Sequence, residues 1–131
     1  MTKAQELGFF AENKAAEYLL SLGWHVLARN VKNQYGELDI IAVDTKIKPE
    51  ELVIIEVRCR TIGKIQPPVD SIGSRKLNSL VKSSRFFIDE TGWESFWRID
   101  VIGITIKKKD DFNDFELEHI RDITAGMNFV A

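Results

Sequence analysis

The sequence is short of cysteine, of proline and of long apolar runs. Its one cysteine, Cys59, cannot form a disulfide within the chain, and charged residues interrupt the N-terminal segment where a signal peptide would need an apolar core. We therefore expect a reducing, cytoplasmic location. No apolar run approaches the roughly 18 residues that a membrane-spanning helix needs, so we expect no membrane partner.

The sequence also lacks a large excess of charge of either sign. The 18 basic and 20 acidic residues give a net charge of −2, which argues against a general binder of polyanions. The basic residues are nevertheless concentrated between positions 58 and 85, where one acid, Asp70, accompanies seven of them: Arg58, Arg60, Lys64, Arg75, Lys76, Lys82 and Arg85. This basic segment is either a phosphate-facing patch or a solvated helix face with its loop.

The chain has 131 residues, 44% of them apolar and 29% charged, which is typical of one globular domain. We expect that domain to span residues 1–131, with a core at about 5–122. Periodicity predicts helices at 2–22 and 74–91, the second capped by Ser74, and strands at 24–31, 37–43, 51–59, 97–106 and 115–120.

The order α-β-β-β-α-β plus a C-terminal strand predicts an α/β fold. Three consecutive strands can pair antiparallel, and the second helix then allows a crossover to a parallel fourth strand. A mixed β-sheet flanked by helices follows from this order.

Two neighbouring strands each change character along one face. In the third predicted strand, at 51–59, Glu56 and Arg58 follow the apolar residues of the face they share. In the strand before it, at 37–43, Glu37 and Asp39 precede Ile41 on one face. If the two strands pair so that residue numbers sum to 95, apolar residues meet apolar ones. Asp39 then lies opposite Glu56, and Glu37 lies opposite Arg58.

This register would set two carboxylates against each other, with Cβ atoms about 4.5–5.5 Å apart. Two such charges repel by roughly 3 kcal/mol at an effective dielectric constant near 20. A divalent cation such as Mg²⁺ or Mn²⁺ reverses the sign of this interaction, because it binds carboxylate oxygens. Arg58 would lie on the same face, where it could meet a phosphate.

A register shifted by two residues is the alternative. Asp39 would then face Arg58 and Glu37 would face Arg60, which gives two cross-strand ion pairs. The cost is an apolar residue opposite Glu56. The pattern of residues alone leaves both registers open.

The segments Gly36-Glu-Leu-Asp39 and Glu56-Val-Arg-Cys-Arg60 resemble the YraN-like family of small bacterial proteins. That family is a branch of the PD-(D/E)XK nuclease-like superfamily, which is related to Holliday-junction resolvases. The likeness extends over about residues 7–120. Further residues match the family's pattern in the same order: Gly8, Glu12, Ala15, Lys76, Arg98 and Asp100.

The resemblance implies a restriction-endonuclease-like core and a metal-dependent endonuclease acting on DNA, with branched or damaged DNA as a substrate. Asp39, Glu56 and Arg58 would be catalytic. Glu12, Asp39, Glu56 and the backbone carbonyl of Val57 would bind Mg²⁺ or Mn²⁺. The relation to resolvases also leaves a homodimer open.

The expected nucleic-acid contacts are basic, and Glu37 would support the neighbouring acids. The residue at 58 departs from the superfamily, where a lysine is usual. Arginine stays protonated and cannot take a proton from water, so DNA binding survives this change better than catalysis does. The rival function is therefore a nuclease-fold module that binds nucleic acid without turnover. In either case the expected contacts are Arg58, Arg60, Lys64, Arg75, Lys76 and Lys82.

Other polar residues have less distinctive surroundings in the sequence. His25 and His119 lack ligand spacing and are expected at strand edges, and Cys59 is expected to be buried and structural. Arg98 and Asp100 share a strand face. They form either a structural pair or part of the surroundings of the acids.

Overall fold

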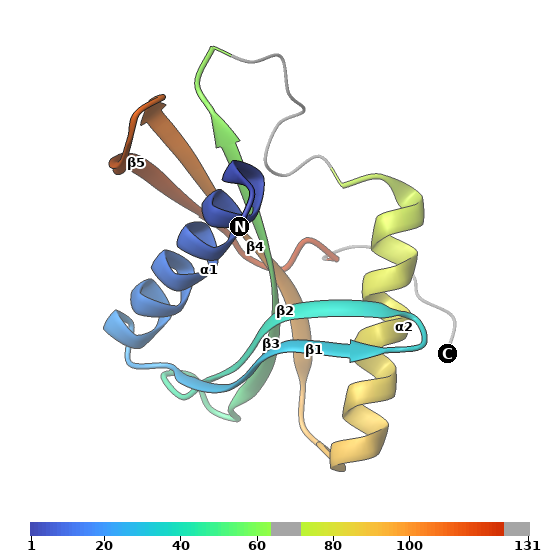
Figure 1. Cartoon of the computed structure of the whole chain (residues 1–131). Helices are drawn as coiled ribbons and strands as arrows, with labels where there is room; N and C mark the ends of the chain where they lie inside the picture. The colour runs from blue at the N-terminus through green and yellow to red at the C-terminus, as the bar shows by residue number, and fades with distance from the viewer. Residues whose placement is uncertain (64–71, 125–131) are drawn as a thin grey trace.

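The computed structural model describes residues 1–63 and 72–124 (Figure 1). Neither of its helices combines the length and the apolar composition of a bilayer span. Its elements, in chain order, are α1 (Lys3–Ser21), β1 (His25–Asn33), β2 (Gly36–Asp44), β3 (Glu51–Thr61), α2 (Ser74–Thr91), β4 (Trp97–Lys108) and β5 (Asp111–Ile120).

The strands form one mixed sheet in the order β1-β2-β3-β4-β5. The first three strands pair antiparallel, β4 runs parallel to β3, and β5 returns antiparallel to β4. The element order and the α/β fold class predicted from the sequence are confirmed. The last strand begins at Asp111, earlier than predicted, because its pairing with β4 continues to Lys108 opposite Asp111 at the hairpin turn.

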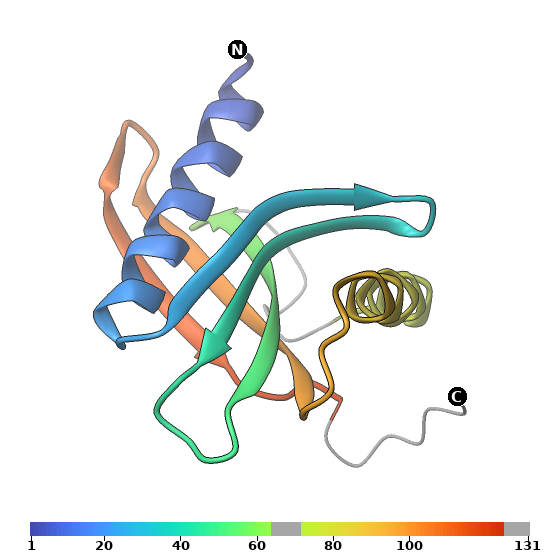
Figure 2. The same ribbon diagram turned by 90° about the horizontal axis from the view of Figure 1, so that it is seen from below.

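The two helices cover opposite faces of the sheet (Figure 2). On one face, α1 packs Ala11, Ala15 and Leu19 against the β-branched residues of β3 and β4. On the other face, α2 packs Leu80 and Val81 against a second buried cluster. Each strand of the sheet's centre therefore presents one set of side chains to α1 and the alternate set to α2.

Both helices have identifiable ends. A capping box starts α1, since Thr2 Oγ1 accepts from the N–H of Gln5 at 3.1 Å and Gln5 Oε1 accepts from the N–H of Thr2 at 2.9 Å. The cap of α2 is Gly73, without a side-chain hydrogen bond, so the prediction of Ser74 as the cap is wrong. Gly92 ends α2 with a φ of 73°, a conformation that favours glycine.

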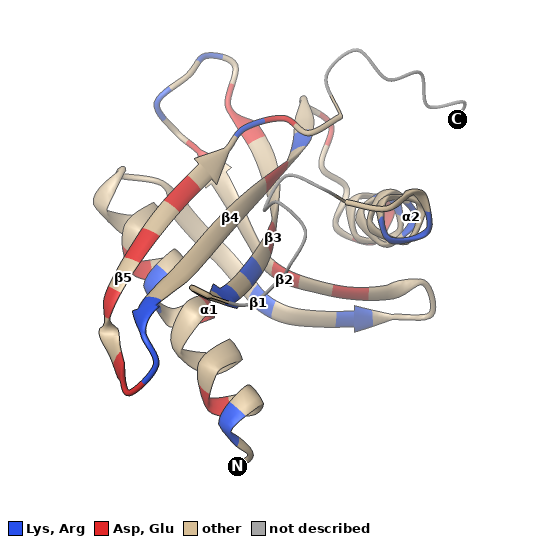
Figure 3. Cartoon of the chain, turned by 90° about the horizontal axis from the view of Figure 1, so that it is seen from above, with Lys and Arg blue, Asp and Glu red and all other residues tan. Residues whose placement is uncertain are grey.

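Charge is unevenly distributed over these elements (Figure 3). Acidic residues recur along β5, the edge strand next to β4. Basic residues occur on α2, which lies on the opposite side of the molecule from β5 in this view. The asymmetry follows the sequence, in which the basic segment precedes the acidic C-terminal strand.

Candidate active site

The register of β2 against β3 is the one in which paired residue numbers sum to 95. It runs from Asp44 opposite Glu51 to Ile40 opposite Ile55. The register shifted by two residues is therefore wrong. The ladder ends one residue before Asp39, so the two predicted acids lie where strand pairing stops.

Beyond the last pair, the side chain of Asp39 takes the place of a strand partner. The backbone N–H of Val57 donates to Oδ2 of Asp39 at 2.8 Å. The N–H and C=O of one strand residue point to the same side. The carbonyl of Val57 consequently also faces β2, past the end of the ladder.

A bend in the β1–β2 hairpin changes the face on which Asp39 lies. Asn30, at the position opposite Asp39, has a φ of 53°, in the left-handed region. Leu38 and Ile41 pack in the same cluster against α2, although unbroken alternation would place them on opposite faces. The expectation that Asp39 shares a face with Ile41 is wrong for this reason.

Asp39 lines a small pocket of about 220 Å³ between α1 and β3. Residues of three elements form its wall, namely Gly8, Ala11, Glu12, Asp39, Val57 and Cys59. Three of the four residues predicted to bind metal thus border one pocket. The fourth, Glu56, precedes Val57 in the chain and does not line this pocket; its carboxylate lies beside that of Asp39 and the ammonium of Lys76.

Glu56 is buried, with 8% of its surface exposed, and meets the first turn of α2. Its Oε2 lies 3.3 Å from Nζ of Lys76. From its sequence context, Lys76 matches the family's pattern and is predicted to contact nucleic acid. The structure adds an ion pair with a predicted catalytic acid.

The two acids interact strongly enough to change a titration. The pKa of Asp39 rises from its ordinary value of 3.8 to about 7. Burial is the main cause, and the nearby charge of Glu56 and a hydrogen bond with it raise the pKa further, against the opposing effects of the Val57 N–H and of Lys76. At neutral pH the pair therefore retains part of one proton.

Glu12 borders the same pocket, but its carboxylate already has partners. Its Oε1 accepts hydrogen bonds from Nε of Arg29 and from Nδ2 of Asn30, both at 2.9 Å. The residue that bends the hairpin therefore also fixes Glu12. A role for Glu12 as a metal ligand stays a prediction; both of these bonds are made to Oε1.

Within residues 1–63 and 72–124, no three side chains of His, Cys, Asp or Glu gather closely enough to hold a metal ion. The groups that approach one another are the carboxylates of Asp39 and Glu56 and the carbonyl of Val57. These are oxygen donors, the kind that Mg²⁺ and Mn²⁺ prefer. Mg²⁺ commonly binds through one or two carboxylates and keeps several waters, so this small donor set fits it.

The predicted basic contacts flank Glu56 on β3 and α2. Arg58 and Arg60 follow Glu56 at two-residue intervals and so lie on its side of the strand, both partly buried. Nε of Arg60 donates to Oγ1 of Thr105 at 3.1 Å. On α2, which covers this side of the sheet, Arg75, Lys76 and Lys82 are exposed. Lys64 lies outside the described residues.

Glu37 and Cys59 differ from their predicted surroundings. Glu37 is exposed and pairs across the hairpin with Lys32, and the β2–β3 ladder ends before it could face Arg58. Cys59 is partly buried instead of fully buried, and burial raises the pKa of its thiol to about 11. Such a thiol is a poor nucleophile at neutral pH, in agreement with the structural role expected for it.

Arg98 and Asp100 belong to a buried network on the α1 face, away from Glu56. The guanidinium of Arg98 contacts Asp44, Glu51 and Asp100, and Asp100 is fully buried. The structural interpretation of the Arg98–Asp100 pair is therefore favoured. Trp24 lies against Arg98, with the guanidinium carbon 5.2 Å from the ring centroid.

The network includes a histidine whose burial the sequence did not reveal. Nε2 of His119 lies 2.8 Å from Oδ2 of Asp100, and its Nδ1 lies 2.9 Å from the hydroxyl of Tyr18. His119 lies on the edge strand β5, as predicted, but its side chain is only 6% exposed. A polar partner on α1 could have been suspected only from Tyr18 interrupting an apolar helix face.

The fold and the site define a class: mixed α/β domains in which two acids meet at the end of a β2–β3 ladder beside a basic helix. Comparison with known families makes this specific. The model of the uncharacterised protein family UPF0102 matches residues 11–104, and the chain belongs to this family. The likeness to YraN-like proteins noted in the sequence is thereby confirmed.

Relatives from distant bacteria carry the same family description. The UPF0102 protein of Marinobacter nauticus is 41% identical over 103 residues, which cover 78% of this chain and 80% of the relative. The UPF0102 protein of Chlorobium chlorochromatii is 31% identical and covers 89% of both chains. That of Mycobacterium tuberculosis is 34% identical and covers 94% of both chains.

Proposed function

We propose that this protein is a divalent-metal-dependent endonuclease that hydrolyses phosphodiester bonds in DNA, with branched or damaged DNA as its substrate class. The proposal includes a restriction-endonuclease-like core, as the sequence motifs imply. The observation that carries it is the meeting of Asp39 and Glu56 at the end of the ladder. Burial and repulsion raise the pKa of Asp39 to about 7, a cost to folding that a binding site for a cation explains.

The residues that would hold the cation are Asp39, Glu56 and the carbonyl of Val57. Their oxygens are the donors that Mg²⁺ or Mn²⁺ prefers, and the pocket beside Asp39 has space for water. When bound, such an ion lowers the pKa of water and offsets negative charge at phosphorus. The protein's part is to hold the two carboxylates in place, which the Val57 N–H does for Asp39 and Lys76 does for Glu56.

Arg58 is the residue proposed to meet the scissile phosphate. It lies two residues beyond Glu56 on the same side of β3, and a guanidinium can bind two phosphate oxygens at once. Because it stays protonated, it stabilises charge and does not remove a proton from water. Lys76 offsets part of the negative charge of the acid pair from the other side.

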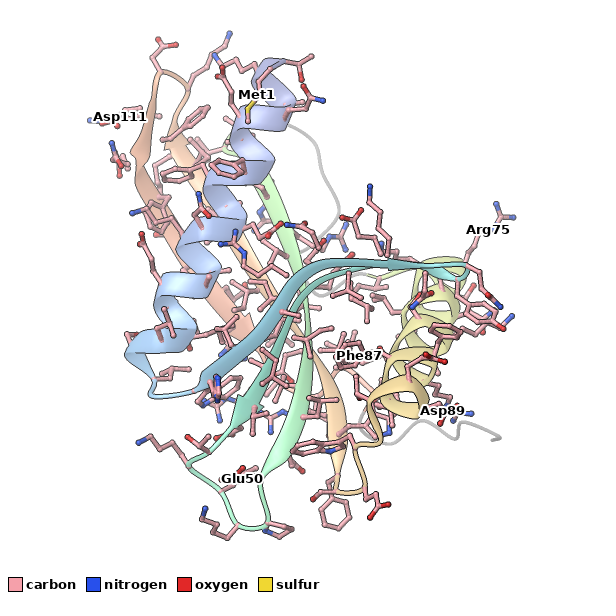
Figure 4. All side chains as sticks on the ribbon, turned by 60° about the horizontal axis from the view of Figure 1, so that its bottom comes forward. Met1, Glu50, Arg75, Phe87, Asp89 and Asp111 are labelled. Atoms are coloured by element: carbon pink, nitrogen blue, oxygen red, sulfur yellow. The ribbon has the colours of Figure 1, made fainter. Side chains whose placement is uncertain are left out.

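A cleavage assay on defined substrates tests the proposal. Linear, flapped and four-way DNA are incubated with the full chain in Mg²⁺, in Mn²⁺ or in EDTA. We expect cleavage of at least one form that requires the metal and is lost in Asp39→Ala. Glu50→Gln is a matched control, because Glu50 lies in the β2–β3 loop far from the Arg75 end of the molecule (Figure 4). Metal-dependent cleavage that persists in Asp39→Ala would contradict the proposed site.

A second function, nucleic-acid binding without turnover, is favoured by specific observations. Arg58 replaces the usual lysine, Glu12 is engaged by Arg29, and Lys76 already compensates Glu56. Under this proposal the surface beside Glu56 serves to bind phosphates. DNA would bind and remain intact in every metal.

The salt dependence of binding addresses this second function. Binding to duplex DNA should weaken with salt by a slope of about 0.9 per phosphate neutralised. The double variant Arg75→Gln, Lys82→Gln should lower that slope by about 2, since two cations are removed. Binding that is absent at low salt, or that does not depend on salt, would contradict both functions.

A further inference from the structure

A second, larger pocket lies beside α1, at the end of the molecule that carries Met1 and Asp111 (Figure 4). Its volume is about 420 Å³, within the range of small-molecule sites. It is bordered by the start of α1, the end of β3 with the residues after it, and the β4–β5 turn. The lining residues are Lys3, Ala4, Leu7, Thr61, Ile62, Gly63, Lys109 and Phe112.

The lining has two chemical parts. Leu7, Ile62 and the ring of Phe112 provide an apolar wall, and Ile62 is 56% exposed, which is unusual for a residue of its kind. Lys3 and Lys109 provide two positive charges, and none of the described residues that line the pocket carries a carboxylate. Among the described residues, neither lysine takes part in an ion pair, although Asp110 and Asp111 line the adjoining hollow with them.

This pocket continues the line of the candidate active site along the same two elements. On β3, Val57 borders the pocket of Asp39 and Thr61 borders the larger one. Four residues of strand separate them by about 13 Å. That distance corresponds to about four steps of 3.4 Å along a stacked DNA strand, and to fewer nucleotides where the strand is extended and its bases are unstacked.

We propose that the larger pocket binds one unpaired nucleotide of a DNA strand, a few steps from the acid pair. The base would lie against the ring of Phe112, because every base offers a flat apolar face to an aromatic side chain. The flanking phosphates would meet Lys3 and Lys109. This inference rests on the proposed function and makes it more specific: the preferred DNA has a splayed or single-stranded segment.

Stacking of a base on Phe112 requires that the base be unpaired. A base in a duplex is stacked on both faces and cannot lie against a side chain until it leaves the stack. A single strand has no such barrier. The pocket should therefore discriminate between splayed and blunt DNA, and it should do so with little preference for sequence.

The test combines binding and photocrosslinking with the full chain. A labelled oligonucleotide with single-stranded 5-iododeoxyuridine is titrated at several salt concentrations, irradiated and mapped by mass spectrometry. The variant Lys3→Gln, Lys109→Gln should lower the salt slope by about 1.4, because single strands contribute about 0.7 per phosphate. The variant Lys46→Gln, Lys48→Gln, in the β2–β3 loop at the opposite end, removes the same charge and should leave the slope unchanged.

Phe112→Leu is the second variant, since leucine keeps apolar packing and loses the aromatic face. Phe112 also packs against Phe10, at a centroid distance of 5.6 Å, so leucine is safer for folding than alanine. Binding of the single strand should weaken roughly 5- to 150-fold, the range for loss of one base–aromatic stack. Blunt duplex should bind as before.

The outcomes separate the pocket from the proposed function. Crosslinks to Phe112 that disappear in Lys3→Gln, Lys109→Gln support the pocket. DNA binding with an unchanged slope, and crosslinks only at other aromatic residues such as Tyr35 or Phe86, would overturn the pocket while leaving Asp39-dependent cleavage intact. Failure to bind any DNA at low salt would overturn both.

Discussion

The backbone N–H of Val57 donates to the carboxylate of Asp39 at the point where β2 and β3 stop pairing. This bond holds the acid beside Glu56 in spite of their repulsion. The raised pKa of Asp39 measures what that arrangement costs. A change of pH or the arrival of a cation should therefore act first on these two residues.

The first prediction concerns Asp39→Asn and pH. The pKa of Asp39 is 3.8 in an ordinary setting and about 7 in the fold, so its contribution to stability is complete below pH 3.8 and is lost as the pH rises through 7. Asparagine does not ionise and keeps an oxygen for the Val57 N–H. At pH 8 the free energy of unfolding of the variant should exceed that of the natural protein by on the order of 2–4 kcal/mol, since one pKa unit corresponds to about 1.36 kcal/mol.

Urea unfolding at pH 4, 6 and 8 measures this difference. Asp89→Asn is the control, because Asp89 is exposed on α2 and should show no comparable trend. A difference between Asp39→Asn and the natural protein that stays constant from pH 4 to pH 8 would contradict the raised pKa of Asp39.

The second prediction concerns Mn²⁺. A cation held by Asp39, Glu56 and the Val57 carbonyl binds the folded chain only, so it should stabilise that chain. At a concentration 100 times the dissociation constant the gain is about 2.7 kcal/mol. Water-proton relaxation reports Mn²⁺ binding directly. Asp39→Asn and Glu56→Gln should each abolish the effect, whereas Glu50→Gln should retain it; equal stabilisation of all four proteins would place the metal elsewhere.

The third prediction concerns the residue at 58. If the site is catalytic, Arg58→Ala should reduce cleavage by roughly 10²–10³, the scale for losing one electrostatic contact in the transition state. Arg58→Lys should keep or raise cleavage, because an ammonium is compact and its pKa can be lowered by desolvation. Without catalysis, Arg58→Lys should only weaken DNA binding through loss of the bidentate contact.

Single-turnover cleavage and equilibrium binding are measured on the same DNA for this comparison. If the natural protein and Arg58→Lys both leave every form of DNA intact with Mn²⁺ present, and Asp39→Ala binds DNA as well as either, the enzymatic proposal should be abandoned for the binding one.

The fourth prediction concerns the buried network. Burial alone would raise the pKa of Asp100, but hydrogen bonds from His119, Arg98 and the N–H of Asp122 outweigh it, and the pKa is lowered. Asp100→Asn leaves Arg98 with less compensation and should cost about 3–5 kcal/mol in free energy of unfolding at pH 7. The stabilisation that accompanies the lowered pKa of Asp100 is present when the pH is above the pKa of the unfolded chain, and it is lost as the pH falls through the pKa of the folded chain. The gap between the two proteins should therefore narrow below about pH 4.

Thermal and urea unfolding from pH 3 to pH 7 provide the measurement. Asp114→Asn on the exposed part of β5 is the control, because its ion pair with Lys108 is a surface contact at 3.7 Å. A loss in Asp100→Asn no larger than in this control would contradict the importance of the network.

Much of the fold follows from local pattern in the sequence. Helical spacing in α1 and α2 and alternation in β3 and β4 place the elements within a few residues of their observed bounds. For the β2–β3 pairing, the sequence pattern leaves two registers open, and the structure has the one that pairs Val43 with Leu52 and Ile41 with Ile54. The meeting of Asp39 and Glu56 at one end follows from that register.

The remainder depends on tertiary contacts that no local pattern reveals. The left-handed conformation of Asn30 moves Asp39 to the α1 face, and an asparagine in a strand signals a turn only weakly. Lys76 reaches Glu56 although a connection of 12 residues, 62–73, separates β3 from α2. His119 is buried by α1, which lies at the other end of the chain. In each case the partner is distant in sequence.

The β1–β2 hairpin, which bends at Asn30, connects the sheet to α2. Its tip is tied to α2, because Ser79 Oγ donates to the carbonyl of Tyr35 at 2.6 Å and Asn33 Nδ2 donates to that of Ser83 at 3.2 Å (Figure 1). The other end of the hairpin pairs with β3 in the sheet, and Asp39 lies at the bend, between that end and the tip. The position of the hairpin tip, and with it the course of the strand that carries Asp39, therefore depends on contacts with α2 as well as on pairing within the sheet.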